Sequence, residues 1–237
     1  MVAHRPNTFR VSGTKPQTFG RRKVLAGGAI AAGAWVTPSV LGFDRVAAAE
    51  GSCCVAPVQV DWSAFTDTFP TSVTANDGTV VTISVADPFG VGDPTFLGRV
   101  FNGDLSSRDD PLIMAMENAT NGQFTEIEFS FSNPVQLCFE LIDVDRGEGS
   151  WEDTMELIGS LGGAPVTVTA ADVVTAATNT VSGPNTILGT SPAAAAATTG
   201  NATVNYPSVI DNFVIRHRDD STFPGFQYIG IHDLRWC

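Results

Sequence analysis

Apolar and polar residues alternate along most of the chain after Val58, and turn residues interrupt the alternation every 8 to 12 positions. Between residues 124 and 132, Ile127, Phe129 and Phe131 share one face while polar side chains share the other. A period of two is typical of half-buried β-strands. The pattern predicts strands over residues 79–85, 124–132, 135–144, 154–158, 165–169, 202–206, 209–216 and 227–236.

The segment 135–144 is apolar on both faces except at Glu140, which predicts a central strand covered on both sides. The short link Asn133-Pro134 predicts that this strand and the one before it are antiparallel neighbours. Only residues 111–118 and 170–178 suggest helices. The chain is therefore expected to be all-β, an antiparallel β-sandwich of the jelly-roll or immunoglobulin-like kind.

The first 49 residues differ from the rest of the chain. A basic stretch ends in Arg21-Arg22-Lys23, an apolar Ala/Gly-rich stretch follows over 24–43, and Ala47-Ala48-Ala49 completes the layout of a secretory signal. The arginine pair makes it resemble a bacterial twin-arginine leader, although Gly20 and Val24 depart from that pattern. A membrane anchor is the alternative, but four glycines and a proline make the stretch a poor spanning helix.

Three regions are expected: a signal peptide over residues 1–49, a cysteine-containing segment over 50–57 and one β-sandwich domain over 58–237. Within the domain, residues 183–200 include five consecutive alanines among Thr, Ser, Pro and Gly, which predicts a long surface loop. Cleavage after Ala49 would leave no membrane span and would place the domain outside the bacterial cytoplasm, secreted or at the cell surface.

The charge excludes some classes of partner. Residues 50–237 hold 6 Arg, no Lys and 24 Asp or Glu, a formal net charge of −18. Such an excess repels phosphate backbones and anionic membranes, because binding to nucleic acid depends on Lys and Arg displacing counterions. The partners left open are a glycan or a cell-surface protein.

The four cysteines are Cys53, Cys54, Cys138 and Cys237, an even set in a chain expected to enter an oxidising compartment. Two disulfides are therefore predicted. Joining the adjacent pair would form a strained ring, so each of Cys53 and Cys54 is expected to pair with one of the other two. Which pairs with which stays open. A zinc site is the alternative, but no C-x-x-C spacing occurs.

The sharpest cluster of candidate chemistry is the acidic run 143–153. Asp143 and Asp145 follow a strand, and the Gly-rich turn after them lets Asp153 return toward them. With Glu148, these carboxylates could supply the oxygens that Ca²⁺ prefers, although the spacing is not that of an EF-hand. The alternative is a tight, solvated hairpin turn.

The runs Phe129-Ser130-Phe131-Ser132-Asn133-Pro134-Val135, Ile142-Asp143-Val144-Asp145, Trp151-Glu152-Asp153 and Ile229-Gly230-Ile231-His232-Asp233 occur in that order. In this they resemble a group of bacterial secreted or cell-surface β-sandwich domains with the motifs F-x-F-S-x-P-V, D-I-D, W-x-D and I-G-I-S-D. His232 stands where serine is usual in the group. The resemblance implies a non-catalytic extracellular module.

Catalysis is not expected. Residues 50–237 contain two histidines, His217 and His232, and no G-x-S-x-G, H-E-x-x-H or Walker A motif. The first hypothesis is a calcium-stabilised binding, adhesive or structural module. The alternative is a carbohydrate-binding module, or an enzyme using Asp or Glu, because aromatic rings form platforms for sugars. Trp151 is the expected exposed ligand-binding ring, with Trp236 and Phe226 in the core.

Overall fold

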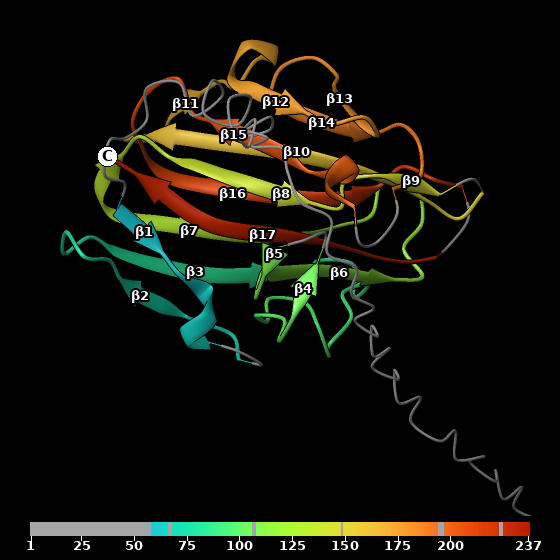
Figure 1. Cartoon of the computed structure of the whole chain (residues 1–237), viewed down its shortest axis with the longest axis horizontal. Helices are drawn as coiled ribbons and strands as arrows, with labels where there is room; N and C mark the ends of the chain where they lie inside the picture. Colours follow the sequence, from blue (N-terminus) through green and yellow to red (C-terminus); the bar gives the residue numbers. More distant parts are fainter. Residues whose placement is uncertain (1–57, 66–67, 106–107, 148, 194–196, 223–224) are drawn as a thin grey trace, which may run out of the picture. The chain divides into compact units, whose positions relative to one another are not determined.

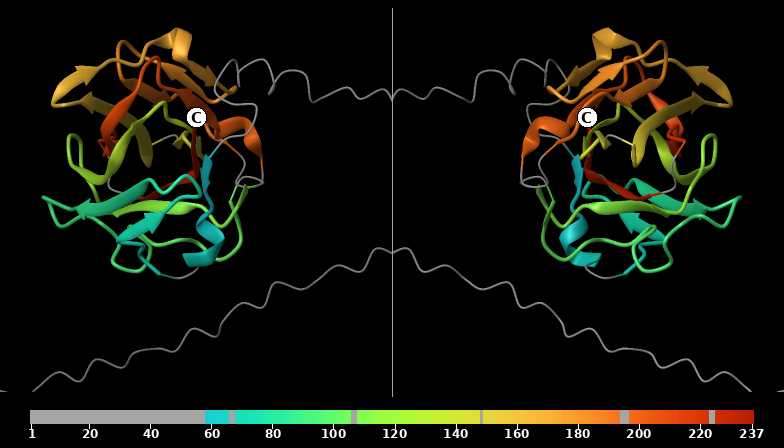
Figure 2. Two further views of the ribbon diagram at one scale, coloured as in Figure 1. Left: turned by 90° about the vertical axis from the view of Figure 1, so that its left-hand side faces the viewer. Right: turned by 90° about the vertical axis from the view of Figure 1, so that its right-hand side faces the viewer.

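The protein folds as a β-sandwich of two antiparallel sheets packed against each other. The computed structural model describes residues 58–237 except 66–67, 106–107, 148, 194–196 and 223–224. The strands run lengthwise in Figure 1, and Figure 2 looks at the same molecule from its two ends. The predicted fold class is confirmed.

One sheet has nine strands, and β10, β16 and β7 form its centre. Its order is β13-β14-β10-β16-β7-β3-β2, and the short strands β9 and β11 also pair with β10. The bounds are β13 (Asn179–Val181), β14 (Thr186–Gly189), β10 (Trp151–Leu161), β16 (Ile210–Asp219), β7 (Phe124–Val135), β3 (Val80–Ala86), β2 (Ser72–Thr74), β9 (Arg146–Gly147) and β11 (Ala164–Val166).

The other sheet has six strands in the order β1-β17-β8-β15-β12, and β6 pairs with the first half of β17. The bounds are β1 (Val58–Val60), β17 (Phe226–Trp236), β8 (Cys138–Ile142), β15 (Ala202–Asn205), β12 (Val173–Thr175) and β6 (Leu112–Glu117). A hairpin of β4 (Asp104–Leu105) and β5 (Arg108–Asp109) and three 3₁₀ turns, η1 (Trp62–Phe65), η2 (Ala170–Asp172) and η3 (Thr198–Gly200), complete the described elements.

The main core lies between the two sheets and is rich in aromatic rings. Phe213 stacks on Phe129 with ring centroids 5.8 Å apart, and it also contacts Phe139 and Tyr206. Trp236 is fully buried, as predicted, and its indole N–H donates to Asp77 Oδ2 at 2.9 Å. Burial of these large rings supplies much of the hydrophobic free energy of folding.

β8 is buried along its whole length, which confirms the prediction of a central strand covered on both sides. Its one charged residue, Glu140, accepts hydrogen bonds from Arg108 Nε at 2.5 Å and Nη2 at 3.1 Å, and from the Asn201 amide at 3.2 Å. A carboxylate can be buried in this way because its oxygens are paired with donors.

Both predicted helices are wrong. Residues 112–117 form strand β6, whose side chains are buried on both faces, so its apolar run lacks the alternation that marks a half-buried strand. Within 170–178, only η2 is helical, and Thr169 caps it through a capping box with Asp172. Strand β12 follows at once.

Two other expectations about connections are also wrong. β7 continues through Asn133 and Pro134 to Val135, and β8 lies in the opposite sheet, so these consecutive strands are not neighbours. The pairing of β7 with β16 shifts register there, because Ile210 pairs with Val135 but Asn212 pairs with Ser130, so the extra residues of this irregularity, Pro134 among them, are in β7. The stretch 183–200 is not one long loop, because it contains β14 and η3.

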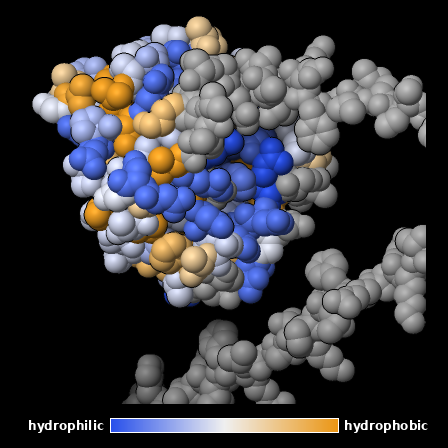
Figure 3. Space-filling model, turned by 60° about the vertical axis from the view of Figure 1, so that its left-hand side comes forward, coloured by the Kyte–Doolittle hydropathy of each residue, from blue (hydrophilic) through white to orange (hydrophobic). Residues whose placement is uncertain are grey.

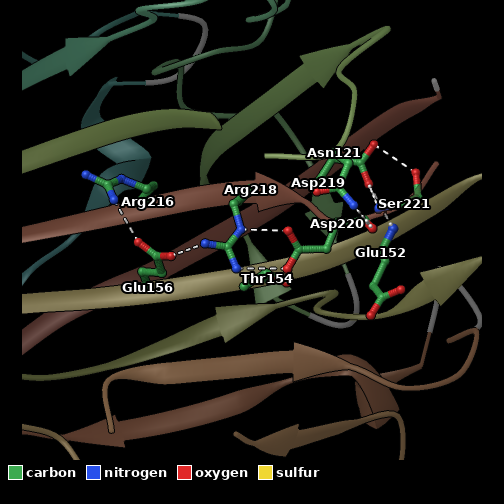
Figure 4. A network of polar contacts seen from close by, with 9 residues as sticks. All are labelled: Asn121, Glu152, Thr154, Glu156, Arg216, Arg218, Asp219, Asp220 and Ser221. Atoms are coloured by element: carbon green, nitrogen blue, oxygen red, sulfur yellow. Dashed lines mark hydrogen bonds and ion pairs between the residues drawn. The ribbon is translucent and has the colours of Figure 1, made fainter. Parts of the chain in front are cut away.

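The outer face of the nine-stranded sheet carries a row of paired charges along β10 and β16 (Figure 4). Glu156 accepts hydrogen bonds from Arg216 Nη1 at 2.8 Å and from Arg218 Nη1. Arg218 also donates to both oxygens of Asp220, which in turn accepts from the Thr154 hydroxyl at 2.7 Å. The contacts of Glu156 with Arg216 and Arg218 join β10 to β16 and are cross-strand pairs. Asp220 lies just after the end of β16, two residues from Arg218.

No helix long and apolar enough to cross a membrane occurs among the residues that the structure describes. The predicted leader, residues 1–49, lies outside those residues.

Candidate functional site

The acidic run leaves the six-stranded sheet where β8 ends. Asp143 has a φ of 67°, a left-handed conformation that Asp and Asn tolerate better than most residues. The pairing of β8 with β17 reaches Gly230 opposite Ile142, and the chain then turns away. It returns through β9, where Gly147 pairs with Trp151 at the start of β10. This path brings the acidic run to the first residues of β17.

Close backbone packing holds the run in place. A Cβ on Gly189 would lie 1.9 Å from the carbonyl oxygen of Asp145, so only glycine fits there. The buried Asn179 amide donates to the carbonyls of Val144, Gly200 and Asn201 at 3.4, 2.9 and 3.3 Å. The run is therefore fixed against β13, β14 and the turn before β15.

A cavity of about 220 Å³ opens beside the run, between the start of β10 and the start of β17. We call it the acidic–aromatic pocket. The residues that line it are Asp143, Asp145, Trp151, Asp153, Ala193, Phe226, Gln227 and Tyr228. None of these eight residues is basic. The structure thus brings together three of the four predicted metal ligands and the predicted ligand-binding tryptophan, whereas Glu148 lies outside the described residues.

The Asp145 carboxylate is held by two N–H donors. The Trp151 indole donates to Oδ1 at 2.6 Å, and the Ala193 backbone donates to Oδ2 at 2.7 Å. Trp151 packs over Gly147, because a Cβ there would lie 2.6 Å from three ring atoms. These contacts fix the tryptophan ring as one wall of the pocket, with its N–H turned toward protein.

Asp153 joins the pocket to a buried polar layer. Its Oδ1 lies 2.8 Å from His217 Nε2, and its Oδ2 accepts the backbone N–H of Asp145 at 3.1 Å. Both side chains of the Asp153–His217 pair are almost completely buried. Burial raises the pKa of Asp153, and the hydrogen bond and charge of His217 act in the opposite direction. The buried carboxylate therefore depends on His217.

Gln227 lines the same pocket from β17 and is only 3 % exposed. Neither its Nε2 nor its Oε1 has a hydrogen-bond partner among the described residues. Thr125 Oγ1 and His217 Nδ1, on adjacent strands, also lack partners within the described part of the chain. A buried amide without partners costs free energy, which hydrogen bonds to a ligand would recover.

Aromatic rings form the outer wall. Phe226 is 44 % exposed, so its predicted place in the core is wrong. It occupies the opposite phase of β17 from the buried Ile229 and Ile231. Its ring contacts Tyr228 and Phe96 with centroids 5.7 and 6.2 Å apart. Phe96 also lines a second cavity of about 240 Å³.

The carboxylates of Asp143 and Asp145 affect the ionisation of Tyr228, one of the aromatic residues that line the pocket. Burial raises the pKa of Tyr228, and the charges of Asp143 and Asp145 raise it further. Figure 3 is turned so that the left-hand side of Figure 1 comes forward, and on that face hydrophilic side chains form a broad central band with smaller hydrophobic patches around it. The pocket itself combines apolar aromatic rings with three aspartates.

Three of the four predicted metal ligands, Asp143, Asp145 and Asp153, are among the described residues. No group of three or more His, Cys, Asp or Glu side chains is arranged there to hold an ion. Both oxygens of Asp145 and of Asp153 already receive N–H donors or face His217. Calcium binding by Asp143, Asp145, Asp153 and Glu148 stays a prediction.

The described cysteines lie at one end of the six-stranded sheet. Cys138 is opposite Arg235 of β17, and the next strand pair places Trp236 opposite Val58. Cys237 therefore lies beside the start of β1, which the segment with Cys53 and Cys54 precedes. No disulfide joins two described residues, and Cys138 is buried. Because Cys53 and Cys54 lie outside the described part, the two disulfides stay a prediction.

Sequence reasoning missed His217 and Gln227. Each occupies the core-facing phase of its strand, His217 after Phe213 and Ile215, and Gln227 before Ile229 and Ile231. A polar residue in the buried phase at a strand end is the signal that could have identified both. Asp153 gives the same signal, since it precedes Met155 and Leu157 in the core-facing phase.

Comparison with known proteins adds no identity, because no protein-family model, curated protein or solved structure matches the chain.

Proposed function

We propose that this protein is an exported, non-catalytic β-sandwich module, secreted or at the cell surface, that binds a ligand in the acidic–aromatic pocket. The leader-like sequence of residues 1–49 and the four cysteines support the compartment. The pocket supports a binding role, because it combines apolar rings with a few convergent polar groups.

The observation that carries this proposal is the Gln227 amide. Its oxygen and nitrogen are buried at the pocket without a partner in the described structure, although most buried polar groups in proteins are hydrogen-bonded. Asp145, Asp153 and Trp151 are each fixed by other residues, so the pocket is pre-formed. A pre-formed site loses little conformational entropy on binding.

Several features favour binding over catalysis. The pocket-lining residues include no Ser, Thr, Cys, Lys or His, so among them only the aspartates and Tyr228 could serve as a nucleophile or base. His217 is fully buried, with Nε2 directed at Asp153. The oxygens of Asp145 and Asp153 are tied to N–H donors, which suits a fixed wall more than proton transfer to a substrate.

A carbohydrate is a second candidate ligand. Tyr228, Phe226 and Phe96 form a row of touching rings that links the pocket to the second cavity. Such rings are suitable platforms for sugar rings, with carboxylates and amides at the edge to accept and donate hydrogen bonds.

A ligand screen tests the proposal. Tryptophan fluorescence and melting temperature of the purified full chain would be followed against a glycan panel, amino acids and amines, and divalent cations. We expect at least one class to bind saturably, and Gln227→Leu to abolish that binding while the fold is kept. Binding that Gln227→Leu and Trp151→Ala leave unchanged would place the site elsewhere, and turnover of any probe would contradict the non-catalytic assignment.

A further inference from the structure

We propose that the ligand of the acidic–aromatic pocket is an organic cation with N–H donors, an alkylammonium or guanidinium group. This inference rests on the proposed function, since it assigns a chemical class to that same pocket. The group could belong to a free amine or to a Lys or Arg side chain of a partner protein.

The charge of the pocket is the first argument. Asp143, Asp145 and Asp153 all line it, with Asp153 facing the buried His217 at 2.8 Å, and no Lys, Arg or His is among its lining residues. Within the described part of the chain, the Asp145 carboxylate is balanced by N–H dipoles from Trp151 and Ala193. Arg146, the nearest arginine in the sequence, is turned to Glu152 at 3.5 Å. A neutral sugar would leave this negative potential in place, whereas a cation would offset it.

The aromatic wall is the second argument. Trp151, Phe226 and Tyr228 line the pocket together with the carboxylates, and organic cations are attracted to the faces of aromatic rings. A hard ion such as Ca²⁺ would instead require six to eight oxygens at about 2.3 to 2.6 Å and gain nothing from rings. The described residues hold no metal-binding group of three.

Gln227 is the third argument, and it favours a cation that carries N–H groups. Its Oε1 is a buried acceptor without a partner among the described residues. An ammonium or guanidinium donor would satisfy it while other donors of the same group reach a carboxylate. A quaternary ammonium has no such donor, so it is expected to bind more weakly.

Calorimetric titration of the full chain with matched probes tests the inference. Butylguanidine and butylamine are expected to bind, with affinity falling as NaCl is raised, while 1-butanol, which shares the chain but not the charge, is expected to bind at least about tenfold more weakly. An acetylated and amidated Gly-Arg-Gly peptide identifies the source: tighter binding than butylguanidine indicates a protein partner, and weaker binding indicates a free amine.

Asp143→Asn removes one charge. The backbone of residue 143 is left-handed, and asparagine tolerates this conformation as aspartate does. It should weaken the binding of butylguanidine about tenfold, whereas Asp109→Asn, an exposed matched change on β5, should leave it unaltered.

Equal binding of 1-butanol, or no effect of Asp143→Asn, would overturn the inference. Binding of Ca²⁺ or a glycan, but no amine, with loss in Gln227→Leu would overturn it and leave the proposed function standing. If no probe of any class binds, both fail.

Discussion

At the scale of single residues, the Asp153–His217 pair shows how a charge is kept inside the sandwich. His217 is fully buried on β16, and its Nε2 lies 2.8 Å from the Asp153 carboxylate. Removing one partner of a buried pair leaves the other without compensation. We expect His217→Leu to lower the free energy of unfolding by about 3 to 5 kcal/mol, measured by urea denaturation.

The double variant His217→Leu/Asp153→Leu separates the charge from packing. It removes both polar groups and should recover most of the stability lost in the single variant. Met155→Leu, a volume-conserving change beside His217 in the sheet, is the control and should cost less than about 1.5 kcal/mol. A double variant as unstable as the single one would show that cavity formation dominates.

The same pair predicts a pH dependence. Because burial raises the pKa of Asp153 above its value of 3.8 in the unfolded chain, this group favours folding below that value and loses its contribution as pH rises through the folded pKa. The destabilisation caused by His217→Leu should therefore shrink as pH is lowered from about 7 toward about 4, because the protonated fraction of Asp153 increases. A penalty that is constant over this range would contradict a charged Asp153.

Gly189 makes a separate prediction. A methyl group at this position would meet the Asp145 carbonyl, which is backbone and cannot rotate away. Gly189→Ala should cost about 1 to 3 kcal/mol or more in thermal unfolding and shift the tryptophan fluorescence, because the loop carrying Asp145 must move. Gly122→Ala is the comparison: its φ is 86° but its side-chain space is open, so it should cost only about 1 kcal/mol and leave the fluorescence unchanged.

At the scale of elements, the charge row on β10 and β16 contributes modestly. Its arginine side chains are 29 % exposed, and exposed pairs contribute about 0.2 to 1 kcal/mol each. Arg216→Gln and Arg218→Gln should each lower the free energy of unfolding by up to about 1 kcal/mol at low salt, and by less in 1 M NaCl. A loss that salt does not change would assign their role to packing, for example of Arg216 over Phe124 at 4.2 Å.

Asp220 makes the stability contributed by this row of charges depend on pH in the acidic range. Burial acts to raise its pKa, but hydrogen bonds from Arg218 and Thr154 outweigh burial and hold the pKa below its usual value of 3.8. Its contribution to stability is present above that value and is lost as pH falls through the folded pKa.

The sequence pattern predicts strands best where one face of the strand is buried and the other is exposed to solvent. β7 and β16 alternate cleanly and begin or end within a few residues of their predicted bounds. Both faces of β6 are buried, so its sequence lacks the alternation that would distinguish a strand from a helix. The short link between β7 and β8 does not show that the two strands lie in different sheets. Partners in a sheet depend on where the chain crosses between layers, which local periodicity does not encode.

The candidate site also has some residues that the sequence pattern identifies and others that only the folded structure identifies. The acidic run and Trp151 stand out in the sequence by composition, and the structure gathers them into one pocket. Gln227 and His217 do not stand out, because a single polar residue in a buried phase becomes meaningful only once the facing sheet is known. Phe226 was assigned to the core for the same reason, since an aromatic residue at a strand end fits either face.

At the scale of the whole molecule, the predicted disulfides would tie the segment before β1 to β8 and to the end of β17. Each would close a loop of more than 80 residues and contribute about 4 to 5 kcal/mol on the chain-entropy model. We expect reduction to lower the melting temperature of the oxidised protein and to allow four alkyl groups to be added, measured by intact mass. Four alkylated thiols without prior reduction would end the disulfide prediction.

The position of β17 also limits when the protein can fold. This strand lies inside its sheet, between β8 on one side and β6 and β1 on the other, yet it follows every other described strand in the chain. The ribosome must therefore have synthesised β17 (Phe226–Trp236) before the six-stranded sheet can form completely. Until then β6 and β8 lack the strand that joins them, so nascent chains would need protection from aggregation, and a stop codon before residue 226 would yield no sandwich.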